Sequence, residues 1–196
     1  MGNRLGRDPG SRFSQGLKEE RILGVDPGTV RTGWGVIDVS GSSLLYLAHG
    51  TIEPPKTQGQ GSRLSCIYHG LQEVLSRYQP RGISLEKVFF ARNAQSVLKL
   101  GQARGVALLA GAENDITVHE YSPTEIKMAV VGYGHASKVQ VQKMVGSLLH
   151  LSSLISPDAA DALAAAICHL HQRSYRARVL EALPSSGQEG RRWGTP

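Results

Sequence analysis

A short apolar segment that ends in a carboxylate is the strongest constraint on how this chain folds. Residues 22–25 are Ile-Leu-Gly-Val, and Asp26 follows them directly, before Pro27 and Gly28. Such an apolar run is typical of a buried strand, and proline with glycine predicts a turn after it. We therefore expect a strand to deliver Asp26 to the edge of a sheet, where a metal ion or a phosphate can approach.

Three more acidic residues lie in distant segments. Glu86 interrupts a second apolar run, where an unpaired charge would be costly to bury. Asp158 and Asp161 open an alanine-rich segment, and their spacing places them on one face of a helix. Acidic residues from three separate segments predict a single metal site, because magnesium prefers oxygen ligands.

Each acidic residue also has an ordinary explanation when it is taken alone. Asp26 is then a turn residue that hydrogen-bonds its own backbone. Glu86 is a strand residue that faces solvent, and the helical pair serves for capping and dipole compensation. Their joint occurrence on matching elements favours the catalytic interpretation for all four.

The size and composition are those of an ordinary globular protein. The chain has 196 residues, of which 40% are hydrophobic and 19% charged, so we expect one well-packed domain. No apolar run approaches the roughly 18 residues of a membrane span, and the start of the chain lacks a secretory signal. We expect a cytoplasmic protein with no membrane association. Cys66 and Cys168 have no metal-ligand spacing, and we expect reduced thiols.

Positive charge is concentrated at the two ends of the chain. The net charge is +6, yet residues 1–21 and 173–196 each carry five basic side chains, against three and two acidic ones. Binding of nucleic acid must therefore depend on where individual charges lie. We expect residues 1–20 to form a flexible extension, residues 21–172 the folded domain, and residues 173–196 a basic, disordered tail.

Hydrophobic periodicity and turn residues predict strands that alternate with helices. The expected strands are residues 22–26, 32–39, 44–52, 83–89 and 116–121. The expected helices are residues 64–78, 95–112, a segment that begins after Ser122, 138–149 and 157–172. Ser122 has the features of an N-cap, with proline next and Glu125 three residues later. This order predicts an α/β fold of the ribonuclease H-like architecture, with a mixed five-stranded sheet and helices on both faces.

Five motifs in this frame closely resemble the RuvC family of Holliday-junction resolvases, in the family's own order. They are Gly-Val-Asp-Pro-Gly at 24–28, Glu-Lys-Val-Phe at 86–89, Leu-Lys-Leu-Gly-Gln-Ala-Arg-Gly at 98–105, Val-Val-Gly at 130–132 and Asp-Ala-Ala-Asp-Ala-Leu at 158–163. The resemblance covers about residues 21–172 and neither tail.

The resemblance implies that Asp26, Glu86, Asp158 and Asp161 are the catalytic, metal-binding acids; the last position is histidine in some members. It also implies two Mg²⁺ ions per site, with Mn²⁺ as a substitute, and water as the nucleophile. Two such ions about 3.5–4 Å apart activate water and offset the charge on the leaving 3′ oxygen.

Aromatic and basic residues are expected to contact DNA, with the ring of Phe89 against bases at the junction crossover. By resemblance or by position, these residues are Phe89, Arg92, Lys99, Arg104, Lys127 and Lys138. Lys127 and Lys138 match family positions that are implicated near DNA.

The implied activity is that of a structure-selective endonuclease. It would resolve four-way DNA junctions by symmetric, magnesium-dependent phosphodiester hydrolysis during recombination and repair. Because a junction has two-fold symmetry, a homodimer is expected, formed through the helix at 95–112, and the resemblance adds cooperation with the RuvA and RuvB branch-migration proteins.

Three alternatives stay open at this point. A RuvX-like RNA-processing nuclease shares the opening Asp-Pro-Gly motif. An actin-like ATPase opens with a similar phosphate-binding turn, but it needs a second such motif and usually a longer chain. A catalytically silent junction-binding protein is the non-enzymatic alternative, and the intact acids at all four positions argue against it.

Overall fold

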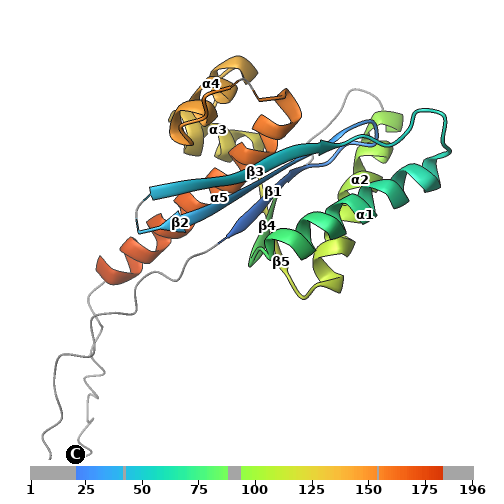
Figure 1. Ribbon diagram of the computed structural model, residues 1–196. Helices are drawn as coiled ribbons and strands as arrows, with labels where there is room; N and C mark the ends of the chain where they lie inside the picture. The colour runs from blue at the N-terminus through green and yellow to red at the C-terminus, as the bar shows by residue number, and fades with distance from the viewer. Residues whose placement is uncertain (1–20, 42, 88–93, 154, 183–196) are drawn as a thin grey trace, which may run out of the picture.

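The structure, a computed structural model, describes residues 21–41, 43–87, 94–153 and 155–182 (Figure 1). These residues form one sheet between two layers of helices. Within these ranges, none of the helices is both long enough and apolar enough to span a membrane.

Five strands of the described residues form a single mixed sheet in the order β3-β2-β1-β4-β5. They are β1 (Ile22–Asp26), β2 (Thr32–Ser40), β3 (Ser43–Ile52), β4 (Gly82–Glu86) and β5 (Thr117–Tyr121). The first three strands form an antiparallel meander, whereas β4 is parallel to β1 and β5 is parallel to β4. The carboxyl ends of β1, β4 and β5 therefore meet at one edge of the sheet.

Helices cover both faces of the sheet, as the sequence predicts (Figure 1). One face carries α1 (Gln60–Tyr78) and α2 (Ala94–Glu113), and the other carries α3 (Pro123–Val131), α4 (Lys138–Leu148) and α5 (Pro157–Ala182). Successive side chains of a strand point to opposite faces. Leu23 and Val25 accordingly pack with α1 and α2, while Ile22 packs with α5.

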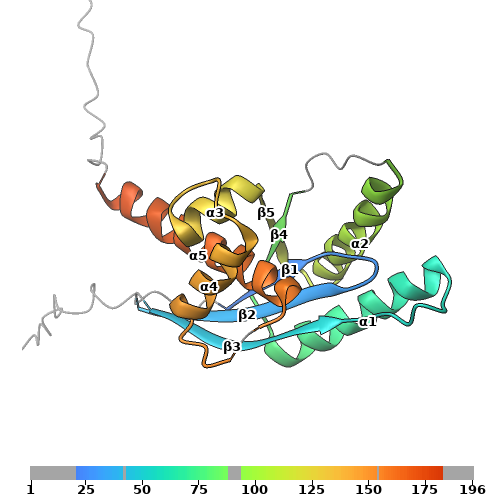
Figure 2. The same ribbon diagram turned by 90° about the horizontal axis from the view of Figure 1, so that it is seen from above.

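The N-terminal half of α5 packs directly against β1 and β2, and Figure 2 shows this helix lying over both strands. Glycines make the close approach possible. A Cβ atom at Gly24 would lie 1.8 Å from the carbonyl oxygen of Ala162, and one at Gly33 would lie 2.0 Å from that of Asp158. The backbone that carries Asp158 and Asp161 is thus held against the strand that ends in Asp26.

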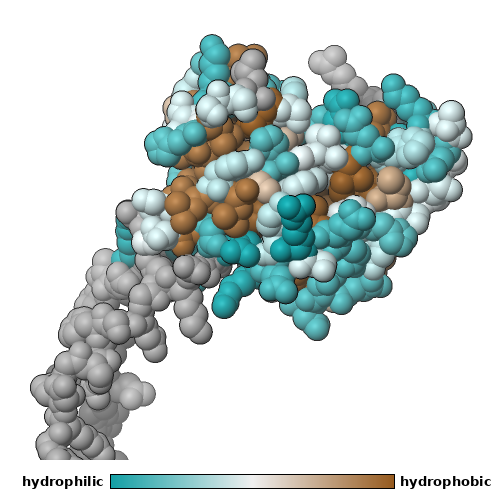
Figure 3. All heavy atoms as spheres, in the orientation of Figure 1, coloured by the Kyte–Doolittle hydropathy of each residue, from teal (hydrophilic) through white to brown (hydrophobic). Residues whose placement is uncertain are grey.

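Some apolar side chains stay exposed at the edge of the sheet and on the helices beside it. Leu45 and Leu47 of the edge strand β3 are exposed, as are Val139 and Met144 of α4. Figure 3 shows apolar residues on this side of the molecule, interspersed with polar ones. Polar neighbours thus divide the apolar surface in this view.

Two sequence expectations are wrong in the structure. β4 ends at Glu86 rather than continuing to 89, so Glu86 is the last residue of its strand. α5 continues to Ala182, past the expected end at 172, and the expected disordered tail is helical over residues 173–182. These residues include no glycine or proline and favour a helix. Their charged side chains therefore belong to an exposed helix surface.

Other local predictions are confirmed. Ser122 caps α3, where its hydroxyl accepts from the Glu125 amide at 3.2 Å and the Glu125 carboxylate accepts from the Ser122 amide at 2.7 Å. Cys66 and Cys168 are free thiols. The expected flexible tails over residues 1–20 and 183–196 lie outside the described residues and stay predictions.

Candidate active site

Two neighbouring parallel strands bring Asp26 and Glu86 to the same edge of the sheet. Asp26 is the last residue of β1 and Glu86 is the last residue of β4. In the pairing of these strands Val25 lies opposite Leu85, so the two carboxylates follow adjacent positions. Asp158, in the first turn of α5, and Asp161, one turn later, complete the group from the helix above.

Burial and mutual repulsion dominate the electrostatics of this group. Burial raises the pKa of Asp26 to about 7, with further upward contributions from Asp161, Glu86 and Asp158. Burial also raises the pKa of Glu86, again with a contribution from Asp161. Glu86, Asp158 and Asp161 therefore all lie within electrostatic reach of Asp26, and their negative charges make its ionisation less favourable.

A lysine from α4 supplies positive charge to this group. Lys138 is the first residue of α4, directly after the N-cap Ser137. Its Nζ donates to Oδ2 of Asp161 at 3.0 Å. This hydrogen bond, together with the charges of Asp161, Asp26 and Glu86, raises the pKa of the lysine.

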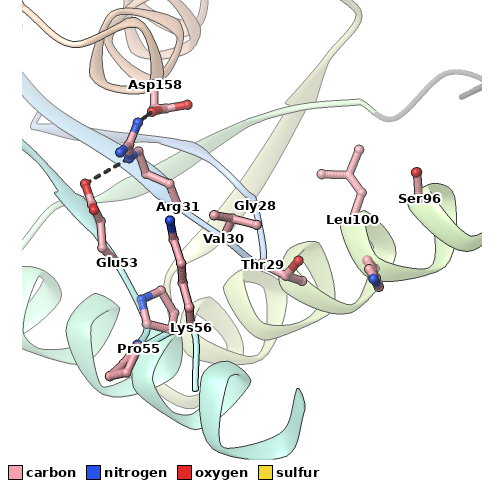
Figure 4. Close-up of a pocket in the computed structure, with 12 residues that line it drawn as sticks. Gly28, Thr29, Val30, Arg31, Glu53, Pro55, Lys56, Ser96, Leu100 and Asp158 are labelled. Carbon is pink, nitrogen blue, oxygen red and sulfur yellow. Dashed lines mark hydrogen bonds and ion pairs between the residues drawn. The ribbon is translucent and has the colours of Figure 1, made fainter. Parts of the chain in front are cut away.

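An arginine from the β1–β2 turn pairs with Asp158. Arg31 donates through Nε to Oε1 of Glu53 at 2.8 Å and through Nη1 to Oδ2 of Asp158 at 3.3 Å (Figure 4). The sheet register explains this placement, because Thr32 lies opposite Ile52 and the residues just outside this pair are Arg31 and Glu53. Neither residue is singled out by the sequence patterns.

The sequence of residues 22–169 matches the profile of the family described as Crossover junction endodeoxyribonuclease RuvC. This chain belongs to the RuvC family. It is therefore a crossover junction endodeoxyribonuclease, and family membership decides against the RuvX-like and actin-like alternatives.

Individual relatives and solved structures agree with this assignment. The RuvC protein of Syntrophotalea carbinolica is 51% identical over 151 residues, which cover 77% of this chain and 94% of the relative. That of Xanthobacter autotrophicus is 48% identical over 167 residues, which cover 85% and 99%. The structure of T. thermophilus RuvC in complex with Holliday junction substrate superposes with a TM-score of 0.76 at 32% identity, over 80% of this chain and 96% of that one. The ribonuclease H-like fold is thereby confirmed.

Membership of the RuvC family implies a divalent-metal nuclease, and the chemistry of the four acids suits such an ion. Carboxylate oxygens are the hard ligands that Mg²⁺ prefers, and a cluster that raises its own pKa values gains from a cation. As the side chains stand, no three Asp, Glu, His or Cys residues of the described ranges are grouped closely enough to hold a metal ion. Asp158 and Asp161 are turned toward Arg31 and Lys138 instead.

The residues expected to bind DNA have different surroundings. Lys99 lines a cleft beside Arg31 and Asp158. Lys127 and Lys138 lower the pKa of Glu86, which places both lysines near the acids. Arg104 is paired within the chain, since its Nε donates to Oε1 of Glu120 at 2.8 Å.

Phe89 and Arg92 lie outside the described residues. Their expected contacts with DNA stay predictions. The cleft is also lined by Lys56, from the segment that follows β3, which the sequence patterns do not single out. The sequence signal for Arg31 and Lys56 was the expected antiparallel meander of the first three strands. In such a meander, the first and third strands finish at the same end of the sheet, so the segments that hold Arg31 and Lys56 lie at the end where Asp26 lies.

Proposed function

We propose that this chain resolves four-way DNA junctions at the site formed by Asp26, Glu86, Asp158 and Asp161. The observation that supports this proposal is the convergence of two strand ends and the start of α5, which brings the other three acids within electrostatic reach of Asp26. In the reaction, the oxygen of a water molecule forms a bond to phosphorus and the bond from phosphorus to the 3′ oxygen breaks. The products are a 5′ phosphate and a 3′ hydroxyl.

Two Mg²⁺ ions, with Mn²⁺ as a substitute, would activate the water and offset negative charge on the leaving oxygen. Asp26, whose pKa is raised by all three other acids, would hold the ions together with them. Its carboxylate must be ionised to bind the ions. Lys138 holds the Asp161 carboxylate in place through its hydrogen bond, and Lys127 reduces the cost of charge on Glu86.

The biological setting is proposed on the same basis. T. thermophilus RuvC has been solved with a Holliday junction substrate, and we propose that this chain binds the same kind of DNA. Two symmetric cuts need two sites, so we propose a homodimer through α2, whose Leu98 and Leu109 are exposed. Cooperation with RuvA and RuvB, and action in the cytoplasm, complete the proposal.

Cleavage of matched substrates tests this function. The full chain is incubated with a mobile four-way junction, with a linear duplex of the same sequence and with an RNA/DNA hybrid, each in Mg²⁺ or in EDTA. We expect paired cuts in the junction alone, and only with Mg²⁺. Cleavage of the duplex or the hybrid at a similar rate, or cleavage in EDTA, would contradict the proposal.

A further inference from the structure

Arg31 forms a short hydrogen bond to Glu53 and a longer one to Asp158. Its bond to Glu53 is short, at 2.8 Å, and Glu53 is itself held by the Thr51 hydroxyl at 3.3 Å. Its bond to Asp158, at 3.3 Å, is longer than a good charge-assisted hydrogen bond. The guanidinium is therefore anchored on the β2–β3 hairpin, and Asp158 is the partner more easily exchanged.

Asp158 has little freedom except in its side chain. Its carbonyl oxygen lies 2.0 Å from the position of a Cβ atom at Gly33, so the backbone cannot move toward the sheet. Its carboxylate is half-buried and contributes less to the raised pKa of Asp26 than Asp161 or Glu86 does. The direction of this carboxylate thus depends on which cation it binds.

Arg31 faces a cleft whose cations suit an incoming phosphate. It lines a cleft of about 710 Å³ together with Lys56 and Lys99, and Asp158 forms part of the same wall (Figure 4). Arginine binds phosphate with two parallel hydrogen bonds, which are stronger than a single long bond to a carboxylate. A phosphate in this cleft would therefore displace Asp158 from the guanidinium while Glu53 keeps its bond.

We propose that Arg31 is a positioning residue, which holds the Asp158 carboxylate away from the other acids until a DNA phosphate takes the guanidinium. The inference rests on the proposed function, because it assigns Asp158 to the metal site. It couples the two ligands of the enzyme: without DNA the metal ion competes with Arg31 for Asp158, and with DNA this competition ends. Substrate binding then completes the metal site.

Opposite effects of two substitutions follow from this competition. Arg31→Gln removes the competitor, so Asp158 binds metal more readily in the absence of DNA. Glu53→Gln leaves the guanidinium to Asp158 alone, so metal binding weakens. The Arg31 side chain is 47% exposed, and solvent screening limits the expected changes to a few-fold.

Titration of the DNA-free protein with Mn²⁺, followed by the electron paramagnetic resonance signal of the free ion, measures these effects. The matched control is Lys56→Gln, which removes a cation from the same cleft without touching Asp158. We expect affinity to rise about threefold in Arg31→Gln, to fall about twofold in Glu53→Gln, and to change by less than about 1.5-fold in the control. Equal gains in Arg31→Gln and Lys56→Gln would show a general charge effect and overturn the proposal, as would no gain in Arg31→Gln.

Coupling to DNA is tested with a junction whose linkages around the crossover are non-hydrolysable methylene phosphonates. At saturating junction, Mn²⁺ affinity should rise more in the wild type than in Arg31→Gln, and an equal rise would also overturn the proposal. Thermal unfolding in EDTA checks that each variant is folded. If Asp26→Asn binds Mn²⁺ as well as the wild type does, the metal site itself is misplaced and both proposals fail. If only the Arg31 comparison fails, the proposed function stands.

Discussion

At the scale of single residues, burial and the neighbouring carboxylates make the ionised form of Asp26 unfavourable. An acid whose pKa rises from 3.8 to about 7 on folding keeps a proton in the folded state that the unfolded chain has already lost. Its contribution to stability therefore falls as pH rises through this window, and the full penalty is present above about pH 7. Bound metal would remove that penalty.

Asp26→Asn should consequently stabilise the metal-free protein at alkaline pH. Asparagine cannot ionise, so we expect a gain in unfolding free energy of about 2–4 kcal/mol at pH 8 in EDTA, which shrinks toward zero near pH 4. Urea unfolding of both proteins across this range measures the difference. A constant difference at all pH values would mean that Asp26 does not titrate in this window.

The sequence singles out the four acids and Lys138, whereas the pairing of Arg31 with Glu53 and Asp158 could not be predicted from it. Asp26 stands out because its strand and turn are local patterns, and Asp158 and Asp161 because they share a helix start. Arg31 meets Glu53 only through the register between β2 and β3. Register depends on long-range pairing, which no local pattern in this chain specifies.

At the scale of elements, α5 is the piece on which the site depends, because it carries two acids and packs on β1 and β2. Its start was predictable from proline and acidic residues at the first turn, but its end was not. Residues 173–182 are polar enough to resemble a tail, yet their helix propensity continues the helix to Ala182.

Gly24→Ala tests the close contact between α5 and β1. The added Cβ atom would lie 1.8 Å from the Ala162 carbonyl oxygen, so the helix must shift. We expect a loss of at least about 3 kcal/mol in unfolding free energy, at the upper end of overpacking effects. Gly61→Ala in α1 is the control, since nothing lies within 4 Å of its added Cβ atom and the stability should be unchanged or slightly higher. Similar stabilities for the two variants would contradict the packing described here.

At the scale of the whole molecule, the fold places the acids at one end of its parallel strands and leaves the opposite end free of them. The carboxyl ends of β1 and β4 present Asp26 and Glu86 at one edge of the sheet. Asp115 lies just before the start of β5, at the opposite end of the parallel strands. Its φ of 53° lies in the left-handed region, which asparagine also tolerates. Asp115→Asn is therefore a matched control for Asp26→Asn, because it makes the same chemical change far from the site.

We propose that Asp26 belongs to the centre that cuts the junction. Single-turnover cleavage of a four-way junction in Mg²⁺, with binding measured in parallel in EDTA, tests it most directly. We predict that Asp26→Asn lowers the cleavage rate by at least about a hundredfold and leaves junction affinity close to that of the wild type, while Asp115→Asn changes neither. Cleavage by Asp26→Asn at more than about a tenth of the wild-type rate, with binding intact, would contradict the claim.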